Sequence, residues 1–164
     1  MRVSAQTTIA APCERVWTIV SDPRQALSFM SGITRWEVVS DQPTGIGARY
    51  RMLLRVGSAE VGGLIEVVEW VPARELAWTS VTGIDQRGRF RLRDAGEGRT
   101  RVELRLAYGV AGSGLTGFLA ERVAAPTVTG HLRRSVRELK RIVEQQQARE
   151  RAVQRPGLRA EPRT

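Results

Sequence analysis

The stretch ARYRMLLRVG, residues 48–57, alternates apolar and mostly charged side chains almost without interruption. In a β-strand successive side chains point to opposite faces of the sheet. The apolar face of this strand would carry Ala48, Tyr50, Met52, Leu54 and Val56. The opposite face would carry Arg49, Arg51, Leu53 and Arg55. The pattern therefore predicts a strand with one face against an apolar interior and the other face mostly arginine.

The same period of two continues on both sides of this strand, from Ile33 to Val110. It predicts six strands, at residues 34–40, 48–56, 60–71, 74–82, 87–94 and 100–110. Short turn-forming segments such as GSA and AGEG separate them, so consecutive strands are expected to pair as antiparallel hairpins. Gly62 and Gly63 lie inside one strand and predict a bend or bulge that lets the sheet curl.

The segment before these strands is predicted to form one strand and two short helices. Residues 2–10 alternate like a strand, whereas APCERVWTIVSDP (residues 11–23) places apolar side chains at helical spacing. Proline suits the first turn of a helix, because its missing N–H has no partner there. Pro12 is therefore expected to begin the first helix, and Pro23 a second one that runs to Met30.

One long helix is predicted after the last strand. Apolar side chains recur at helical spacing from Leu115 to Val143, and Pro126 is expected to kink this helix. The six strands have one apolar face each, which the helix is expected to cover. The predicted fold is α+β, a curved seven-stranded antiparallel sheet wrapped around a long C-terminal helix, with two short helices after strand 1. Residues 1–147 are expected to form a single domain, and 148–164 a basic, disordered tail.

Composition limits the class of protein. The chain has 164 residues, is 41% hydrophobic and carries a formal net charge of +9, with Lys140 as the one lysine among 26 basic residues. No apolar run approaches the roughly 18 residues that span a bilayer, and the N-terminus lacks the pattern of a signal peptide, so a cytoplasmic location is expected. The single cysteine, Cys13, excludes an internal disulfide and a cysteine metal cluster.

Three segments carry a resemblance to a known superfamily. They are I-x-A-P-x-E-x-V-W-x-I-V-S-D-P at 9–23, WVPARELAW at 70–78, and GRFRL with GRTRVELRL within 88–106. With the order of elements, they resemble the START-type, or SRPBCC, helix-grip superfamily, which includes polyketide cyclase/dehydrases and pollen-allergen-like proteins. The resemblance covers about residues 3–145. It implies a cavity between the curved sheet and the long helix, in a superfamily whose members bind lipids, hormones, quinones or polyketides and share no catalytic motif.

The resemblance implies that inward-facing side chains line this cavity. The candidate ligand-binding residues are Trp17, Phe29, Met30, Tyr50, Met52, Leu54, Ile65, Val67, Trp78, Phe90, Leu92, Leu104, Tyr108, Phe118, Arg122 and Thr129. Ordinary core packing is the alternative for each apolar member. Arg122 lies on the apolar stripe of the helix, where it would either extend to the rim or hold an acidic or carbonyl group of a ligand.

Two functions remain open at this point. The favoured interpretation is binding of a small hydrophobic ligand, such as a lipid, polyketide, isoprenoid or quinone-like molecule, for carriage or presentation. The alternative is a polyketide cyclase or dehydratase that acts in the same cavity without a metal. The sequence contains no nucleophile–base pair, phosphate loop or metal cluster, so no catalytic residue, metal or cofactor is assigned.

The arginine-rich face offers a second possible site of interaction. Nine arginines on three strands are predicted to face away from the helix, at Arg49, Arg51, Arg55, Arg87, Arg89, Arg91, Arg93, Arg101 and Arg105. One interpretation is an ordinary solvated face in which carboxylates separate the arginines. The other is a surface that binds a membrane, an acidic carrier protein or RNA.

Overall fold

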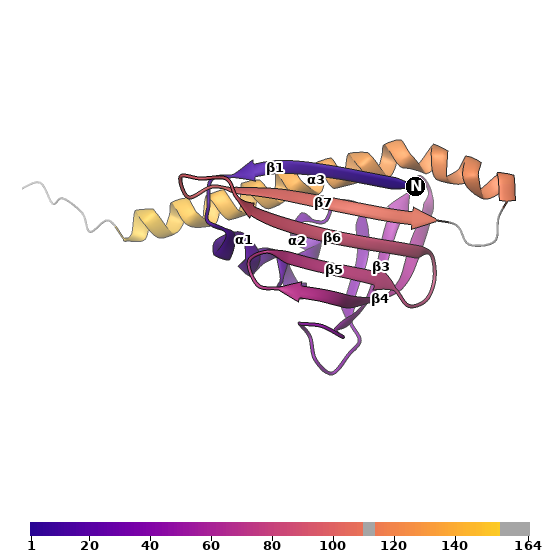
Figure 1. The fold of residues 1–164 in the computed structure, drawn as a ribbon, viewed down its shortest axis with the longest axis horizontal. Helices are drawn as coiled ribbons and strands as arrows, with labels where there is room; N and C mark the ends of the chain where they lie inside the picture. The colour runs from indigo at the N-terminus through magenta and orange to yellow at the C-terminus, as the bar shows by residue number, and fades with distance from the viewer. Residues whose placement is uncertain (110–113, 155–164) are drawn as a thin grey trace, which may run out of the picture.

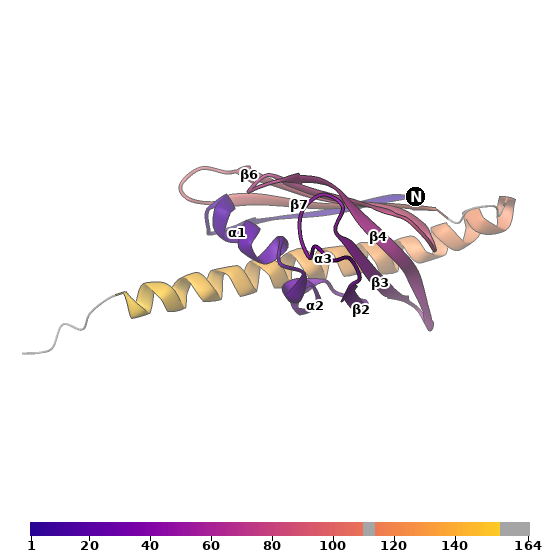
Figure 2. The same cartoon turned by 90° about the horizontal axis from the view of Figure 1, so that it is seen from below.

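A single antiparallel sheet of seven strands curves over a long helix in the computed structural model (Figures 1 and 2). The strand order across the sheet is β1-β7-β6-β5-β4-β3-β2. The strands are β1 (Arg2–Ile9), β2 (Ile33–Val38), β3 (Arg49–Val56), β4 (Ala59–Val71), β5 (Glu75–Ser80), β6 (Asp85–Asp94) and β7 (Thr100–Gly109). Every neighbouring pair is antiparallel, which confirms the predicted seven-stranded sheet.

The helices all lie on one side of this sheet (Figure 2). They are α1 (Cys13–Val20), the 3-10 helix η1 (Pro23–Gln25), α2 (Ala26–Phe29) and α3 (Gly114–Val153). The predicted second short helix is thus divided into η1 and α2. Its capping residue is Asp22, whose carboxylate accepts a hydrogen bond from the backbone N–H of Arg24 at 3.0 Å.

The structure describes residues 1–109 and 114–154, without the side chains of residues 114–124. Phe118 and Arg122 therefore lie outside the described side chains. Helix α3 continues through Pro126 to Val153, beyond the expected start of a tail at residue 148. Within this extension Glu150 accepts a hydrogen bond from the Arg15 guanidinium at 2.9 Å. No helix in the described parts of the chain is long and apolar enough to cross a membrane.

The inner face of the sheet and residues 125–153 of α3 are in direct contact. Five α3 side chains at helical spacing are at most 6% exposed, namely Val128, Leu132, Val136, Leu139 and Val143. They pack mainly toward β1 and β7. Two polar contacts fix the same interface, from Lys140 Nζ to the Thr8 carbonyl at 2.6 Å and from the Ala10 N–H to Glu144 at 2.9 Å. Side chains therefore fill the space between sheet and helix along this part of α3.

The predicted irregularity at Gly62–Gly63 takes a different form. The register of β4 shifts between Val67 and Glu69, and no shift is found at the two glycines. Instead the glycines allow close backbone approach, since a Cβ on Gly63 would lie 2.2 Å from the carbonyl oxygen of Thr82. The glycine pair thus lets the turn between β5 and β6 lie against the backbone of β4, where the Ile84 N–H donates to the Gly62 carbonyl at 3.2 Å.

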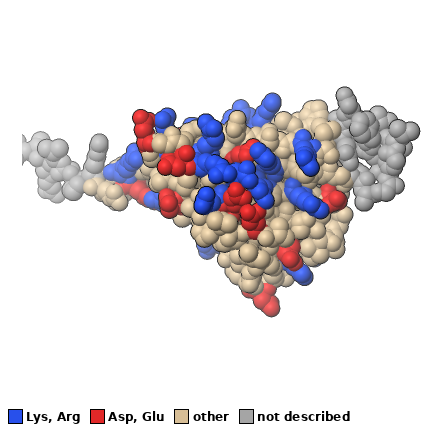
Figure 3. Space-filling view, viewed as in Figure 1, with Lys and Arg blue, Asp and Glu red and all other residues tan. Residues whose placement is uncertain are grey.

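The outer face of the sheet carries the predicted arginines, interspersed with glutamates (Figure 3). Ion pairs of 2.6–3.9 Å join Arg49 to Glu66, Arg51 to Glu37, Arg55 to Glu60, Arg89 to Glu69, Arg91 and Arg93 to Glu75, and Arg105 to Glu103. Arg87 and Arg101 have no carboxylate partner within the described part of the chain. The glutamates relieve most of the repulsion that adjacent arginines would cause.

Candidate ligand-binding site

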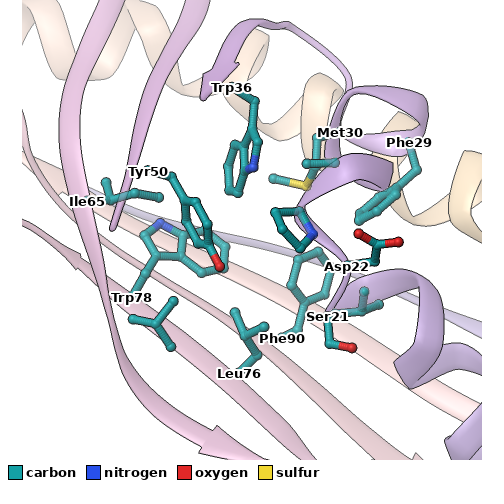
Figure 4. A pocket seen from close by; sticks show the side chains of 14 residues that line it. Ser21, Asp22, Phe29, Met30, Trp36, Tyr50, Ile65, Leu76, Trp78 and Phe90 are labelled. Carbon is teal, nitrogen blue, oxygen red and sulfur yellow. The ribbon is translucent and has the colours of Figure 1, made fainter. Parts of the chain in front are cut away.

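A pocket lies between the inner face of the sheet and the short helices α1 and α2 (Figure 4). Seven of the predicted ligand-binding residues line it, namely Phe29, Met30, Tyr50, Ile65, Val67, Trp78 and Phe90. The free volume inside this partly open pocket is about 30 Å³. Because one water molecule needs roughly 10–15 Å³ measured in this way, the pocket has room for about two water molecules.

Aromatic rings form most of the walls. The indole of Trp36 stacks on the ring of Tyr50 with centroids 5.0 Å apart. Phe90, at the base of the pocket, contacts Phe29 from α2 and Trp78 from β5, each at a centroid distance of 6.0 Å. Such ring pairs contribute about 0.5–1.5 kcal/mol beyond the apolar area that they bury. The rings therefore hold α2 against the sheet while also shaping the pocket.

Two hydrogen-bond donors in the wall lack a partner. The indole nitrogens Nε1 of Trp36 and Trp78 are buried and contact no acceptor in the described structure. An indole N–H can only donate, and leaving such a group unsatisfied costs about 1–3 kcal/mol. Both side chains line the pocket, and an acceptor oxygen within reach of either N–H, from water or from a ligand, would relieve this cost.

The other polar groups near the pocket are already engaged. The Tyr50 hydroxyl donates to the carbonyl oxygen of Pro43 at 2.7 Å, and burial raises its pKa to about 12. Asp22 accepts two hydrogen bonds from the Arg24 guanidinium at 3.0 Å each, and these bonds lower the pKa of its carboxyl group. The Ser21 hydroxyl donates to the carbonyl oxygen of Trp17 at 2.7 Å.

The remaining predicted site residues whose side chains are described lie outside this pocket. Met52, Leu92 and Leu104 are buried in the core beyond the pocket, and Leu54, Tyr108 and Thr129 are half-buried. Trp17 packs edge-to-face on Trp70, with ring centroids 5.1 Å apart, and does not line the pocket.

The helical wall of this pocket comes from the short helices. Among the described side chains, none from α3 lines this pocket, whose helical wall comes from α1, η1 and α2. Along the part of α3 whose side chains are described, the apolar stripe from Val128 to Val143 packs against the sheet. The other lining residues are Val20, Ser21, Asp22, Pro23, Ala26, Trp36 and Leu76. Trp36 could have been found, because it alternates inward on β2 opposite Met52.

The comparisons with known proteins agree with this architecture. Residues 1–144 match the family described as polyketide cyclase / dehydrase and lipid transport. The chain belongs to this family. The match confirms the resemblance to the START-type, SRPBCC superfamily that the three sequence segments indicated. No curated protein sequence matches significantly.

Several solved structures share the fold. The protein TTHA0849 from Thermus thermophilus is 24% identical over 87% of this chain and 97% of that one, with a TM-score of 0.74. The Zhui aromatase/cyclase from Streptomyces sp. R1128 is 18% identical over 89% and 94%, with a TM-score of 0.75. A START superfamily protein from Mycobacterium smegmatis is 19% identical over 88% and 98%, with a TM-score of 0.68. At these identities the similarity establishes the helix-grip fold.

Proposed function

We propose that the protein binds a small, mainly apolar ligand with at least one hydrogen-bond-accepting oxygen, in the pocket between the sheet and α1–α2. Carriage or presentation of that ligand would be its role. The observation that carries the proposal is the pair of buried, unpartnered indole N–H groups, Trp36 and Trp78, in an aromatic wall. A carbonyl or phenolic oxygen would satisfy them, and the rings would contact the apolar remainder. The family description, which includes lipid transport, supports the same chemistry.

Ligand entry requires the pocket to open. A volume of about 30 Å³ is too small for such a molecule, so part of the wall must move outward. The segment between β2 and β3 is held to the sheet through the hydrogen bond from Tyr50 to Pro43. Helix α2 is a single turn with Leu27 55% exposed. These two segments are the parts of the wall that we expect a ligand to displace.

Binding fits the polar groups better than proton transfer does. A phenol with a pKa of about 12 is a poor acid or base at neutral pH, and it is bonded to Pro43. Asp22 is held ionised by Arg24 at the mouth. A cyclase or dehydratase reaction is the second candidate function, because the family description also includes cyclases and dehydrases.

A matched pair of ligands tests the proposal. 2-Methyl-1,4-naphthoquinone and 2-methylnaphthalene differ in the two carbonyl oxygens, so titration by tryptophan fluorescence should give tighter binding of the quinone. Trp36→Phe should weaken quinone binding by about fivefold, the equivalent of about 1 kcal/mol for one hydrogen bond. Trp17→Phe is the control, since Trp17 lies outside the pocket.

Two results would contradict the proposal. One is the absence of binding to the quinone and to a wider panel of fatty acids, isoprenoids and aromatic polyketides. The other is equal binding of the quinone and the hydrocarbon, with no effect of Trp36→Phe. Chromatography of linear polyketide analogues after incubation with the protein decides between carriage and cyclisation, because carriage returns them unchanged.

A further inference from the structure

One recess in the arginine-rich outer face includes two arginines, Arg2 and Arg87, that have no carboxylate partner among the described residues. It is an open groove of about 890 Å³ lined by residues of β1, β4, β5, β6 and β7. Arg2, Arg87, Arg89 and Arg105 belong to its walls, and none of the described residues that line it is acidic. The glutamates that pair with Arg89 and Arg105 are not part of the lining. The groove therefore concentrates positive charge on a face that is otherwise mixed (Figure 3).

The strand register sets the shape of this groove. Ala107 on β7 lies directly opposite Arg2 on β1 and also opposite Arg87 on β6. The methyl group of Ala107 leaves open space between the two arginines. Adjacent strands are about 4.8 Å apart, so the backbones at Arg2 and Arg87 are separated by about 10 Å. Two arginine side chains at this separation can both reach one small anion between them.

A second pair of arginines closes the groove along the strands. Arg105 on β7 lies directly opposite Arg89 on β6, and Arg89 lies opposite Ala77 on β5. The four arginine positions thus lie around two alanines, Ala77 and Ala107, on the outer face of the sheet. Large side chains at Ala77 and Ala107 would fill this space.

Arg2 and Arg87 keep their hydrogen-bonding capacity free. Neither forms an ion pair with any residue that the structure describes. Asp85 is two residues before Arg87 on the same face, where it accepts a hydrogen bond from the Ser80 hydroxyl at 3.4 Å. A guanidinium binds a phosphate or carboxylate through two parallel hydrogen bonds. Two arginines without ion pairs, one on either side of Ala107, therefore suit an anion with two charges.

We propose that this groove binds the phosphate group of a small phosphorylated molecule. Its volume is within the range of small-molecule sites, roughly 300–1,000 Å³, so it has room for more than the phosphate. Single-stranded nucleic acid is bound by stacking of its bases on exposed aromatic rings. The one aromatic residue among the described lining residues, Trp78, is buried and also forms part of the wall of the pocket on the inner face, so it offers no exposed ring to a base. A flat membrane surface does not enter a recess on the convex side of a sheet.

The test is a calorimetric titration with inorganic pyrophosphate and with adenosine monophosphate, at constant ionic strength. The double variant Arg2→Ser with Arg87→Ser should bind both probes at least about tenfold more weakly, because each charged hydrogen bond is worth about a factor of ten or more. Arg101→Ser is the matched control. Arg101 is exposed on the same face and unpaired among the described residues, but lies outside the groove, so its loss should change affinity by less than about twofold.

Three outcomes would overturn the proposal. The first is that the wild-type protein binds neither probe. The second is that the double variant and Arg101→Ser weaken binding equally, which would indicate general attraction to net charge. The third is binding confined to phosphatidic acid vesicles or to single-stranded RNA. All substituted arginines are exposed, and thermal unfolding of each variant checks that the fold is retained.

Discussion

The Nε2 nitrogen of His131 lies 3.1 Å from the backbone carbonyl oxygen of Arg55. Since a carbonyl oxygen only accepts, Nε2 carries the ring proton and Nδ1 is free to accept. Nδ1 lies 3.0 Å from a guanidinium nitrogen of Arg134, which donates to it. Arg134 also donates to the Ser31 hydroxyl at 3.1 Å. The neutral imidazole therefore joins α3 to the end of β3 and to the segment after α2, one wall of the pocket.

This arrangement predicts a loss of stability on mild acidification. Burial and the charge of Arg134 lower the pKa of His131 below its ordinary value of about 6.5. The unfolded chain then binds a proton at a higher pH than the folded protein does. The stabilisation that the neutral His131 contributes is complete above about pH 6.5. It is lost as the pH falls through the pKa of His131 in the folded protein. Denaturant unfolding measured at steps from about pH 7 to about pH 5 should show this decrease.

The matched variant for this prediction is His131→Gln, whose amide can donate to Arg55 but does not titrate. Its unfolding free energy should stay nearly constant over the same interval. The pKa values of Asp22, Glu60, Glu75 and Glu138 are lowered by their arginine partners and hydrogen bonds, so these carboxylates titrate at more acidic pH. The same pH dependence in both proteins would show that His131 is not its source.

Gly88→Ala should destabilise the protein strongly. The ring of Trp78 lies against β6 at this position, and a Cβ on residue 88 would be 1.9 Å from a ring atom. The indole would have to move into the pocket or away from Phe90. Overpacking of this kind costs about 1–3 kcal/mol. Urea unfolding measures the loss, and a change below about 0.5 kcal/mol would mean that Trp78 is held less firmly than its 4% exposure indicates.

Gly130→Ala should have the opposite effect. Residue 130 is inside α3, and an added Cβ would meet no atom closer than 3.9 Å, at the Arg134 guanidinium. Alanine loses less backbone freedom on folding than glycine and gains about 0.5–1 kcal/mol in a helix. The unfolding free energy should therefore rise by this amount. An unchanged value would indicate that the helix around residue 130 is only partly formed in solution.

The fold could be predicted from the sequence because apolar and polar side chains alternate along its strands, whereas apolar side chains recur at helical spacing along its helices. The period of two over residues 48–56 depends on one face being buried and the other solvated, which holds most clearly for β3, β6 and β7. The end of α3 was harder to place. Residues 148–153 have few apolar side chains, and the helix there is fixed partly by the ion pair between Arg15 and Glu150, which are distant in sequence.

The pocket could be predicted only in part. Tyr50 and Met52 face the same side of β3, yet the first lines the pocket and the second lies in the core. Alternation along a strand predicts which face of the sheet a side chain lies on, but not which other residues pack over it. The position of the short helices relative to the sheet decides which inward residues remain beside open space. This position depends on contacts such as Phe29 on Phe90, which no local pattern specifies.

Tyr50→Phe should loosen the segment between β2 and β3 without disturbing the rest of the sheet. The substitution keeps the ring that stacks on Trp36 and removes the hydroxyl that donates to Pro43 at 2.7 Å. Loss of this bond should cost about 1 kcal/mol, which corresponds to about a fivefold rise in local opening. The amide of Gly47, bonded to the Val67 carbonyl at 2.8 Å, reports on the segment in hydrogen exchange. Its exchange should accelerate by that factor while amides paired between β6 and β7 remain unchanged. Equal acceleration of both would point to global destabilisation and would contradict a local role for the Tyr50 hydroxyl in closing the pocket.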